Sequence, residues 1–567
     1  MKVGVCKKRR KKEREINSDK IISRREALST AAKVAISAVI AGVVAGVGGY
    51  FAGSATAPGK TVTVRETKTE TVTMGAATTV TTTVTATPKV SKPFQGVKLT
   101  MAMFEGPAVT EGFRIHYPKW AERSGAEIEF VTMGFADIYP KIMQDLTSGA
   151  GRFDVILYPY DYMGDFAPYL LPLDDYVRKS PELAWRDILR HELRQATWGG
   201  KIIAVPYDGD YMGLFYRKDI LTNPDYRAEF KKKYGYELPV PPRTLDQLID
   251  VAEFFNGWDV DGDGKVEYGT IVEGTRAADF CLIYYVSNWM APYAVMPSPP
   301  AKYPGIFWFD PETMEPLINS PGHVRGLEKY IEVMKRGCSP GVFEATRSDV
   351  LSNITNGNVV LGIDWHDIIM VVESSKEPLK TKHKMGCAIT PGSTEYWDRL
   401  QQKWVKVEGV HYVPCLSFGG WFMSITKTCK NPDAAFDWIA FTASPEIHGY
   451  DITQYYGNAP VRYSEIFNPD VELFKKTGWT EEALWDWLNN QVIPTHLNPN
   501  AVLDINIPGM AEYMDAFNVN VERAIKGQLS PKDALDEVAS EWEKITEKRG
   551  RDKQLKYYRA ALGLPTD

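Results

Sequence analysis

The sequence predicts an α/β protein in which apolar strands alternate with helices. Val97–Gly106 is an apolar strand that ends at a glycine loop, and Ala126–Met133 alternates apolar and polar residues as a second strand. Tyr139–Gly149 has the pattern of a helix with a glycine stop, and Phe153–Gly164 has that of a buried strand ending in aromatic residues. Strands that alternate with helices predict parallel sheets, in which ligands bind at the carboxyl ends of the strands.

The first 53 residues predict a basic cytoplasmic segment, residues 1–30, and a membrane segment, residues 31–53. Residues 1–26 carry eleven Lys or Arg and four Asp or Glu, a net charge of +7, which leaves −13 for the rest of a chain whose total is −6. Nineteen uncharged residues run from Val34 to Ala52. At about 1.5 Å per residue they are long enough to cross about 30 Å of hydrocarbon. Basic residues before an apolar run keep the N-terminus in the cytoplasm and place the remainder of the chain outside.

The same region also resembles a cleavable export signal. Arg24-Arg25 before the apolar run matches a twin-arginine signal, although Ala27 stands where a bulkier apolar residue is usual. Ala55-Thr56-Ala57 resembles a small-residue cleavage site, and Pro58 directly after it should hinder cleavage. We therefore expect a retained anchor, with a removed signal as the alternative.

Residues 54–95 are expected to form an extended surface stalk. Thirteen of the 27 residues from Thr61 to Thr87 are Thr, and large apolar residues are lacking. Such a segment cannot bury enough surface to offset the entropy of ordering it, and Thr-rich segments of this kind are often O-glycosylated. The globular body is expected to begin near Gly96.

The sequence lacks the motifs that identify several functional classes. A nucleic-acid-binding arm is disfavoured, because the basic segment leads directly into an apolar run. Five Cys lie after that run, an odd number, and no CxxC pair or Cys/His cluster predicts a zinc site or a disulfide-built fold. No nucleophile elbow, zinc-protease, P-loop or dinucleotide motif is present.

Six segments occur in the order found in one protein family. They resemble motifs of the extracellular solute-binding proteins of ABC importers, in the sugar-binding branch related to maltose-binding protein. The stalk is similar to those of archaeal members. The segments are DVILYPYDYMGDFAPYLLPLDDYV (154–177), KIIAVPYDGDYMGLFYRKDIL (201–221), PPRTLDQLIDVAEFF (241–255), NGNVVLGIDWHD (356–367), GGWFMSITKTCKNPDAAFDWIAFTASPE (419–446) and YYGNAPVR (455–462).

This resemblance implies a periplasmic-binding-protein-like fold, with two α/β lobes joined by a hinge and a ligand cleft between them. Lobe one is expected at residues 96–206 and 424–470, lobe two at 207–423, and C-terminal helices packing across both at 471–567. Ser530 is the predicted N-cap of the last long helix, with Asp533 at position N3. The implied protein is a monomeric receptor on the outer side of the plasma membrane. Its expected ligand is a saccharide, in the first place an oligosaccharide, which it would deliver to a separate permease.

The resemblance also suggests ligand-binding residues. Aromatic rings pack on the CH faces of sugars, and carboxylates accept hydrogen bonds from their hydroxyls. The candidates are Glu105, Tyr158, Asp161, Tyr207, Asp208, Asp210, Trp365 and Trp421. The alternative for the aromatic residues is a place in the core, and for Asp208 and Asp210 a purely structural role at the hinge.

One loop has the spacing of a calcium site. In DVDGDGKVEYGT (259–270) the ligands would be the side chains of Asp259, Asp261, Asp263 and Glu267 and the carbonyl of Lys265. Thr270 stands where the bidentate Glu of an EF-hand loop belongs. Similar loops occur in the family, so we expect structural Ca²⁺, with a solvated acidic turn as the alternative.

Other functions are also compatible with the sequence. Paired carboxylates can hydrolyse glycosides, and Asp364 and Asp367 flank Trp-His, although a sequence alone cannot place two carboxylates across a cleft. A structural surface protein, or a receptor for peptides or polyols, also fits these segments. The order of segments favours a binding protein that is not an enzyme.

Overall fold

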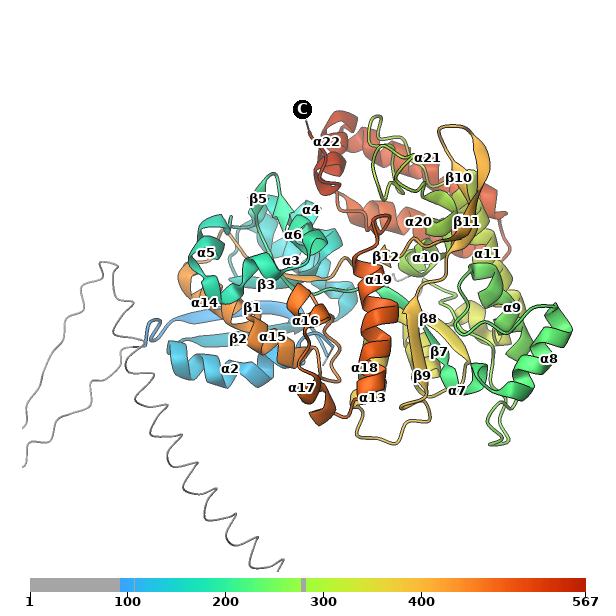
Figure 1. Cartoon of the computed structure of the whole chain (residues 1–567). Helices are drawn as coiled ribbons and strands as arrows, with labels where there is room; N and C mark the ends of the chain where they lie inside the picture. The colour runs from blue at the N-terminus through green and yellow to red at the C-terminus, as the bar shows by residue number, and fades with distance from the viewer. Residues whose placement is uncertain (1–91, 107, 277–281, 567) are drawn as a thin grey trace, which may run out of the picture. The chain divides into compact units, whose positions relative to one another are not determined.

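Two β-sheets organise the residues that the structure describes. The computed structural model describes residues 92–106, 108–276 and 282–566, and the predicted cytoplasmic segment, anchor and most of the stalk lie outside them. The first sheet has five strands in the order β2-β1-β3-β13-β6, and the second has three in the order β8-β7-β9 (Figure 1). The first sheet with the helices packed on it forms lobe 1, and the second sheet with its helices forms lobe 2.

The sheet of lobe 1 combines parallel and antiparallel strands. Its strands are β1 (Lys98–Phe104), β2 (Glu127–Met133), β3 (Val155–Pro159), β6 (Val205–Asp208) and β13 (Trp421–Ile425). β1 is parallel to β2 and β3, as predicted, whereas β13 is antiparallel to both β3 and β6. The predicted strand at 153–164 ends at Pro159, and the chain then turns helical.

Helices cover the sheet of lobe 1. They are α2 (Glu111–Ser124), α3 (Phe135–Ser148), η1 (Tyr160–Tyr162), α4 (Met163–Phe166), η2 (Ala167–Tyr169), α5 (Asp174–Lys179), η3 (Pro181–Leu183), η4 (Trp185–Asp187), α6 (Arg190–Gln195), α14 (Pro432–Thr442), α15 (Pro445–Asp451) and α16 (Tyr463–Phe467). Trp120 of α2 and Trp438 of α14 are fully buried, with ring centroids 5.2 Å apart. These two rings join segments that are more than 300 residues apart in sequence.

The sheet of lobe 2 is antiparallel throughout, which corrects the prediction of parallel sheets. Its strands are β7 (Met212–Arg217), β8 (Leu361–Trp365) and β9 (Met385–Ile389). Its helices are α7 (Lys218–Leu221), α8 (Pro224–Tyr234), α9 (Leu245–Phe255), α10 (Leu282–Ala294), α11 (Pro321–Gly337), η5 (Pro340–Glu344), α12 (Arg347–Thr355) and α13 (Asp367–Ser374). Hydrophobic periodicity reports which residues are buried but not which way a strand runs.

Three small two-stranded sheets complete the strands. They pair β4 (Thr197–Trp198) with β5 (Lys201–Ile202), β10 (Ser393–Asp398) with β11 (Lys403–His411), and β12 (Cys415–Leu416) with β14 (Val502–Leu503).

The C-terminal helices pack mainly on lobe 2. They are α17 (Val471–Lys476), α18 (Glu481–Trp487), η6 (Leu488–Val492), α19 (Ile493–His496), α20 (Met510–Ile525), α21 (Pro531–Arg549) and α22 (Arg551–Ala561). α18 and η6 lie against β9, α20 lies against α10, and α21 against α11 (Figure 1). Tyr557 of α22 stacks on Trp198 of lobe 1 at 5.3 Å. The predicted cap of α21 is confirmed, because the Ser530 side chain accepts a hydrogen bond from the amide of Asp533.

Two of the expected lobe boundaries fall inside strands. The boundary at 206/207 lies within β6, and the one at 423/424 lies within β13. Both strands belong to the sheet of lobe 1 and lie beside residues 209–211, where the chain passes to lobe 2, and an extended segment of this kind has no composition change that marks the hinge.

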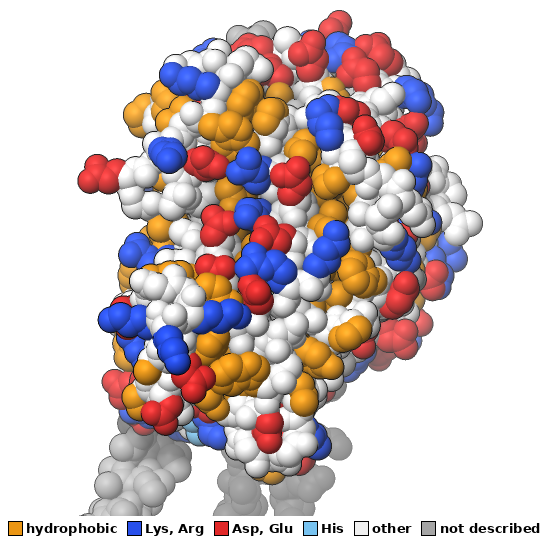
Figure 2. Space-filling view, turned by 90° about the vertical axis from the view of Figure 1, so that its right-hand side faces the viewer, with side chains coloured by type: hydrophobic (Ala, Val, Ile, Leu, Met, Phe, Trp, Pro, Cys, Tyr) orange, Lys and Arg blue, Asp and Glu red, His pale blue; other side chains and the backbone are white. Residues whose placement is uncertain are grey.

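The face seen in Figure 2 carries acidic and basic side chains interspersed rather than segregated by sign. Cys338, Cys387, Cys415 and Cys429 are free thiols. None of the described helices has the length and apolar character that crossing a membrane requires.

A glycine directly before β13 permits the close approach of β13 to β6. Gly420 has φ +94°, and a Cβ at this position would lie 2.1 Å from the carbonyl oxygen of Asp208. Only glycine accommodates both the backbone conformation and the contact without displacing β6.

Gly420→Ala is therefore expected to destabilise the protein much more than a matched glycine substitution. Gly409→Ala is the control, because Gly409 has φ +85° and nothing within 4 Å of the added Cβ. The control should cost about 1–2 kcal/mol of unfolding free energy for its left-handed backbone. Gly420→Ala should cost about 2–5 kcal/mol, since overpacking adds to the same strain. Thermal unfolding of the two variants measures the difference, and equal losses would contradict the proposed contact.

Candidate functional site

The chain crosses from lobe 1 to lobe 2 at residues 209–211. β6 ends at Asp208 and β7 begins at Met212. β13 returns beside this crossing, with Trp421 paired to Asp208 in the register of the sheet. Side chains at the end of β6 and at the start of β13 are thus brought together where the two lobes meet.

A cavity of about 210 Å³ lies at this junction and has walls from both lobes. The residues that line it are Phe104, Ala108, Val109, Phe135, Asp208, Asp210, Arg347, Ser348, Trp365, Asp367, Phe418, Trp421 and Gly457. Phe104, Phe135 and Trp421 come from lobe 1, whereas Arg347, Trp365 and Asp367 come from lobe 2. This is the cleft position that the two-lobe prediction requires.

Aromatic rings form much of the cavity wall. Phe418 stacks on Trp365 at a centroid distance of 5.0 Å, and the indole N–H of Trp365 donates to the carbonyl of Ser417 at 2.7 Å. Phe135 lies 5.3 Å from Phe418, and Phe104 lies 5.8 Å from Trp421. Rings from both lobes therefore present a preformed apolar surface to whatever enters the cleft.

One arginine of lobe 2 neutralises part of the acidic charge in the cleft. The Nη2 atom of Arg347 lies 2.8 and 2.7 Å from the two oxygens of Asp367, and its Nε is 3.6 Å from Asp364. Its guanidinium also lies over the ring of Trp365, 5.4 Å from the centroid. Burial raises the pKa of Asp364 to about 7, and the positive charge of the nearby Arg347 partly opposes this shift.

Two further carboxylates at the crossing, Asp208 and Asp210, form no ion pair with an arginine or a lysine among the residues that the structure describes. Asp208 is fully buried, and its Oδ1 accepts a hydrogen bond of 2.6 Å from the amide of Ala459. Asp210 is 6% exposed and lies 3.3 Å from Nδ1 of His366. Burial raises the pKa of both carboxyls well above the usual range, and neighbouring carboxylates raise it further.

Four of the eight predicted ligand-binding residues line the cavity. They are Asp208, Asp210, Trp365 and Trp421.

The other four lie elsewhere. Glu105 is exposed outside the cavity. Tyr158 and Tyr207 are fully buried in lobe 1, where their hydroxyls bond to Ser424 at 2.9 Å and to Asp451 at 2.9 Å. Both side chains point into the core, because successive residues of a strand face opposite sides of its sheet.

Asp161 has a different position, between the lobes. It follows β3 of lobe 1, and its Oδ2 accepts a hydrogen bond of 2.6 Å from the hydroxyl of Tyr284 in α10 of lobe 2. Burial raises the pKa of Asp161 to about 7.

Several cavity residues were not predicted from the sequence. Arg347 begins a helix in a segment with no recognised motif, and Phe418 precedes the Gly-Gly pair that drew attention to Trp421. Asp367 belongs to the Asp-Trp-His-Asp segment, in which the sequence suggests only a catalytic pair with Asp364. In the structure Asp367 is bound by Arg347, which leaves it poorly suited to act as an acid or base.

A lysine side chain, that of Lys380, lies at the predicted calcium loop. The ammonium of Lys380 lies 2.6 Å from Asp261, 3.2 Å from Asp263 and 3.0 Å from Glu267. Asp259 caps the turn by accepting from the amides of Gly262 and Gly264 at 2.7 and 3.0 Å. The carboxylates suit Ca²⁺ by their chemistry, but three of them already face an ammonium group.

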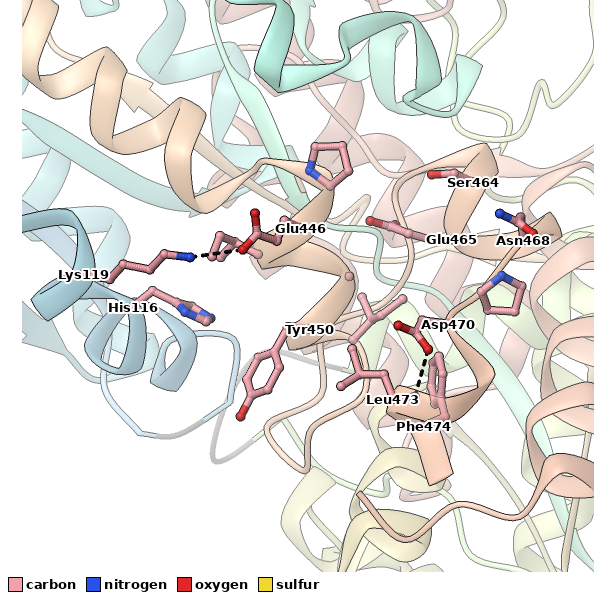
Figure 3. Close-up of a pocket in the computed structure, with 15 residues that line it drawn as sticks. His116, Lys119, Glu446, Tyr450, Ser464, Glu465, Asn468, Asp470, Leu473 and Phe474 are labelled. Atoms are coloured by element: carbon pink, nitrogen blue, oxygen red, sulfur yellow. Dashed lines mark hydrogen bonds and ion pairs between the residues drawn. The ribbon is translucent and has the colours of Figure 1, made fainter. Parts of the chain in front are cut away.

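A second hollow, of about 520 Å³, lies between helices α2, α15 and α16 of lobe 1 and the C-terminal helix α17, and it shares no lining residue with the cleft cavity (Figure 3). Its charged groups already have partners. Lys119 pairs with Glu446 at 3.1 Å, and Asp470 accepts from the amide of Leu473 at 3.0 Å. Glu465 bonds to the ring of His448 at 2.7 Å. A ligand would therefore find fewer charged groups without a partner in this hollow than in the cleft.

Comparison with known proteins gives one family. The family model described as bacterial extracellular solute-binding protein matches residues 119–477. A probable amino-acid ABC transporter periplasmic-binding protein of Sinorhizobium fredii is 21% identical over 391 residues, 68% of this chain and 77% of the relative.

Solved structures share the fold. A solute-binding protein of Agrobacterium radiobacter in complex with ribitol has a TM-score of 0.61 at 21% identity, covering 80% of this chain and 100% of its own. The maltose-bound MalE3 of T. maritima has a TM-score of 0.60 at 21% identity, covering 79% and 100%. The resemblance drawn from six short segments is thereby confirmed: the chain belongs to the family of extracellular solute-binding proteins, which serve ABC transporters.

Proposed function

We propose that this protein captures a small saccharide or polyol between its lobes and presents it to an ABC permease without chemically changing it. The observation that carries the proposal is the cavity at the crossing strands, where rings and carboxylates from both lobes converge. Rings suit the CH faces of a sugar and carboxylates suit its hydroxyls. Structural neighbours bound to ribitol and to maltose support this class of ligand.

The size of the cavity favours a single small unit over the oligosaccharide expected from the sequence. At about 210 Å³ it is smaller than the range of roughly 300–1,000 Å³ that is typical of ligand pockets. A longer saccharide would require the lobes to stand further apart than they do here.

Capture by lobe closure is consistent with the composition of the walls. A solute that contacts Trp421 of lobe 1 and Trp365 of lobe 2 gains both contacts only when the lobes are close. Such a solute shifts an open–closed equilibrium toward the closed state by its preference for that state.

The family is extracellular, and we propose that residues 31–53 anchor the protein to the outer side of the plasma membrane. Residues 54–95 would then act as a stalk that keeps a monomeric receptor close to its permease, at a high effective concentration. Removal of the N-terminal segment as a twin-arginine signal is the alternative, and mass spectrometry of the mature N-terminus distinguishes the two.

A thermal-shift and calorimetry screen tests the proposed function directly. The purified protein is exposed to monosaccharides, disaccharides, oligosaccharides and linear polyols, with amino acids and short peptides as controls. A solute at about 100 times its Kd should stabilise the folded state by about 2.7 kcal/mol. Stabilisation by amino acids or peptides alone would overturn the ligand class, and stabilisation by no solute would overturn the function.

Tyr284→Phe is expected to weaken solute binding, because it removes the hydrogen bond between Tyr284 and Asp161 that joins the two lobes. A hydrogen bond contributes about 0.5–1.5 kcal/mol, so the Kd should rise about 2- to 12-fold for whichever solute the screen identifies. The matched control is Tyr158→Phe, whose lost hydroxyl bonds to Ser424 within lobe 1. Calorimetry should find the affinity of the control unchanged, and equal effects would count against closure at this contact.

We also propose that the 259–270 loop binds Ca²⁺ in competition with Lys380. The donors would be the carboxylates of Asp259, Asp261, Asp263 and Glu267 and the carbonyl of Lys265, with Thr270 supplying no bidentate group. A bound ion would have to displace the ammonium of Lys380 from three carboxylates, which predicts weak binding by the natural protein.

Lys380→Met should therefore strengthen calcium binding. Without the ammonium group, three neighbouring carboxylates repel one another and a divalent cation relieves that repulsion. The Tm should rise more on adding CaCl₂ after EDTA treatment in this variant than in the natural protein. Lys384→Met, at an exposed lysine nearby, is the control and should respond as the natural protein does. A variant that is indifferent to calcium would leave the loop as an acidic turn held by Lys380.

A further inference from the structure

A histidine beside the cleft presents an unused lone pair. Nε2 of His366 lies 2.9 Å from the carbonyl oxygen of Gly457. A carbonyl only accepts, so Nε2 carries the proton. Burial lowers the pKa of His366 to about 4, and the ring is therefore neutral near neutral pH. Nδ1 is then an acceptor, and none of the described residues hydrogen-bonds to it.

Two carboxylates face the same region. Oδ1 of Asp210 lies 3.3 Å from Nδ1 of His366 without forming a hydrogen bond, and Oδ2 of Asp208 has no hydrogen-bond partner among the described residues. Asp208, Asp210 and His366 each offer a nitrogen or carboxylate oxygen to one cluster whose atoms lie within 4.8 Å of one another, and Nε2 of His366 lies 3.7 Å from Oδ1 of Asp208. Three buried polar side chains thus gather at the crossing, and the hydrogen bonds of Arg347 go to Asp367 instead.

The carboxyls at the crossing lack a cationic partner. Among the described residues, Arg347 pairs with Asp364 and Asp367, whereas Asp208 and Asp210 form no ion pair with an arginine or a lysine. The burial that raises their pKa favours the uncharged form of both carboxyls, and a cation held between them would favour the ionised form. A sugar hydroxyl brings a donor but no charge, whereas a primary ammonium brings three donors and a positive charge.

The aromatic walls suit a cation as well as a sugar. The faces of Trp and Phe rings attract positive charge, most strongly where water is excluded. Trp365 already holds the guanidinium of Arg347 over its ring in this way. Trp421 and Phe104 line the cavity on the side of lobe 1, where no described cation contacts them.

We propose that the transported solute carries a protonated primary amine, as an amino sugar or an amino polyol does, and that its ammonium group binds between Asp208, Asp210 and His366. This inference rests on the proposed function, since it names the chemistry of the solute that the same cleft captures. The hydroxyls of the solute would face Arg347 and Asp367, and its CH faces would lie against the rings.

Matched pairs of ligands test the inference on the natural protein. Calorimetry at one pH compares D-glucosamine with D-glucose, D-galactosamine with D-galactose, and 1-amino-1-deoxy-D-sorbitol with D-sorbitol. In at least one pair the amine should bind 10-fold or more tightly than its hydroxyl counterpart, and N-acetyl-D-glucosamine should lose that advantage. Equal or tighter binding of the neutral members would overturn the inference while leaving the proposed function standing. Binding of no member of the panel, nor of any solute in the wider screen, would overturn both.

The variant Asp210→Asn tests whether the preference for amines over their hydroxyl counterparts arises from the cluster of Asp208, Asp210 and His366. The variant keeps the size of the side chain and removes its charge, so the ratio of amine to hydroxyl affinity should fall about 10-fold. Asp398→Asn is the control, because Asp398 is a buried carboxylate of the β10 hairpin that lies outside the cleft, and its ratio should match that of the natural protein. An unchanged ratio in Asp210→Asn would contradict the assignment.

A metal ion could bind the Asp208, Asp210 and His366 cluster instead of an ammonium group, and one further measurement distinguishes the two. Binding of the amine is measured with and without EDTA, and Zn²⁺ alone is titrated into the natural protein and into Asp210→Asn. Amine binding that is indifferent to EDTA supports the proposal. Zn²⁺ binding that requires Asp210, together with loss of amine binding in EDTA, would overturn it.

Discussion

The pairing of β6 with β13 is the contact on which the site depends. These strands come from positions more than 200 residues apart, and they meet so closely that Gly420 lies against the carbonyl of Asp208. The register sets Trp421 opposite Asp208, so one ring and one carboxylate are placed at the cleft by backbone hydrogen bonds. The chain passes from lobe 1 to lobe 2 directly after β6, at residues 209–211. A change in the pairing of β6 with β13 would therefore alter both the wall of the cavity and the adjacent connection between the lobes.

Burial of acidic groups is the second constraint, and it divides the cleft into two parts. On the lobe 2 side, Arg347 neutralises Asp367 and approaches Asp364, so that part is close to balanced. At the crossing, the polar contacts of Asp208 and Asp210 are with a backbone amide and with an imidazole that burial keeps uncharged. Burial and the neighbouring carboxylates raise the pKa of both carboxyls, so their ionised form lacks a stabilising partner. A cationic ligand would supply that partner, which is a better explanation for two buried carboxyls at this place than a contribution to folding.

The sequence could predict the two-lobe fold and four of the thirteen residues that line the cavity, for identifiable reasons. Trp365, Trp421, Asp208 and Asp210 belong to segments whose order along the chain identifies the family, and those segments form the crossing. Tyr158 and Tyr207 lie in the same segments, but strand alternation turns them into the core, and a one-residue difference in register cannot be read from a motif. Arg347 and Phe418 reach the cavity only through tertiary packing, with no local pattern to indicate it. The antiparallel direction of the strands in lobe 2 could not be predicted either, because it too depends on tertiary packing.

The acidic loop at 259–270 shows what a local sequence motif can and cannot predict. Its spacing of Asp259, Asp261 and Asp263 is that of a calcium loop, and the loop does fold so that these carboxylates converge. The group that lies among them, however, is the ammonium of Lys380, which is more than a hundred residues away in sequence. In the cleft, the corresponding acidic cluster meets no such lysine. Two clusters of similar composition thus differ in whether the fold supplies the cation, and the one that lacks it lies where a solute enters. That contrast within one chain is the physical reason to seek the positive charge on the solute.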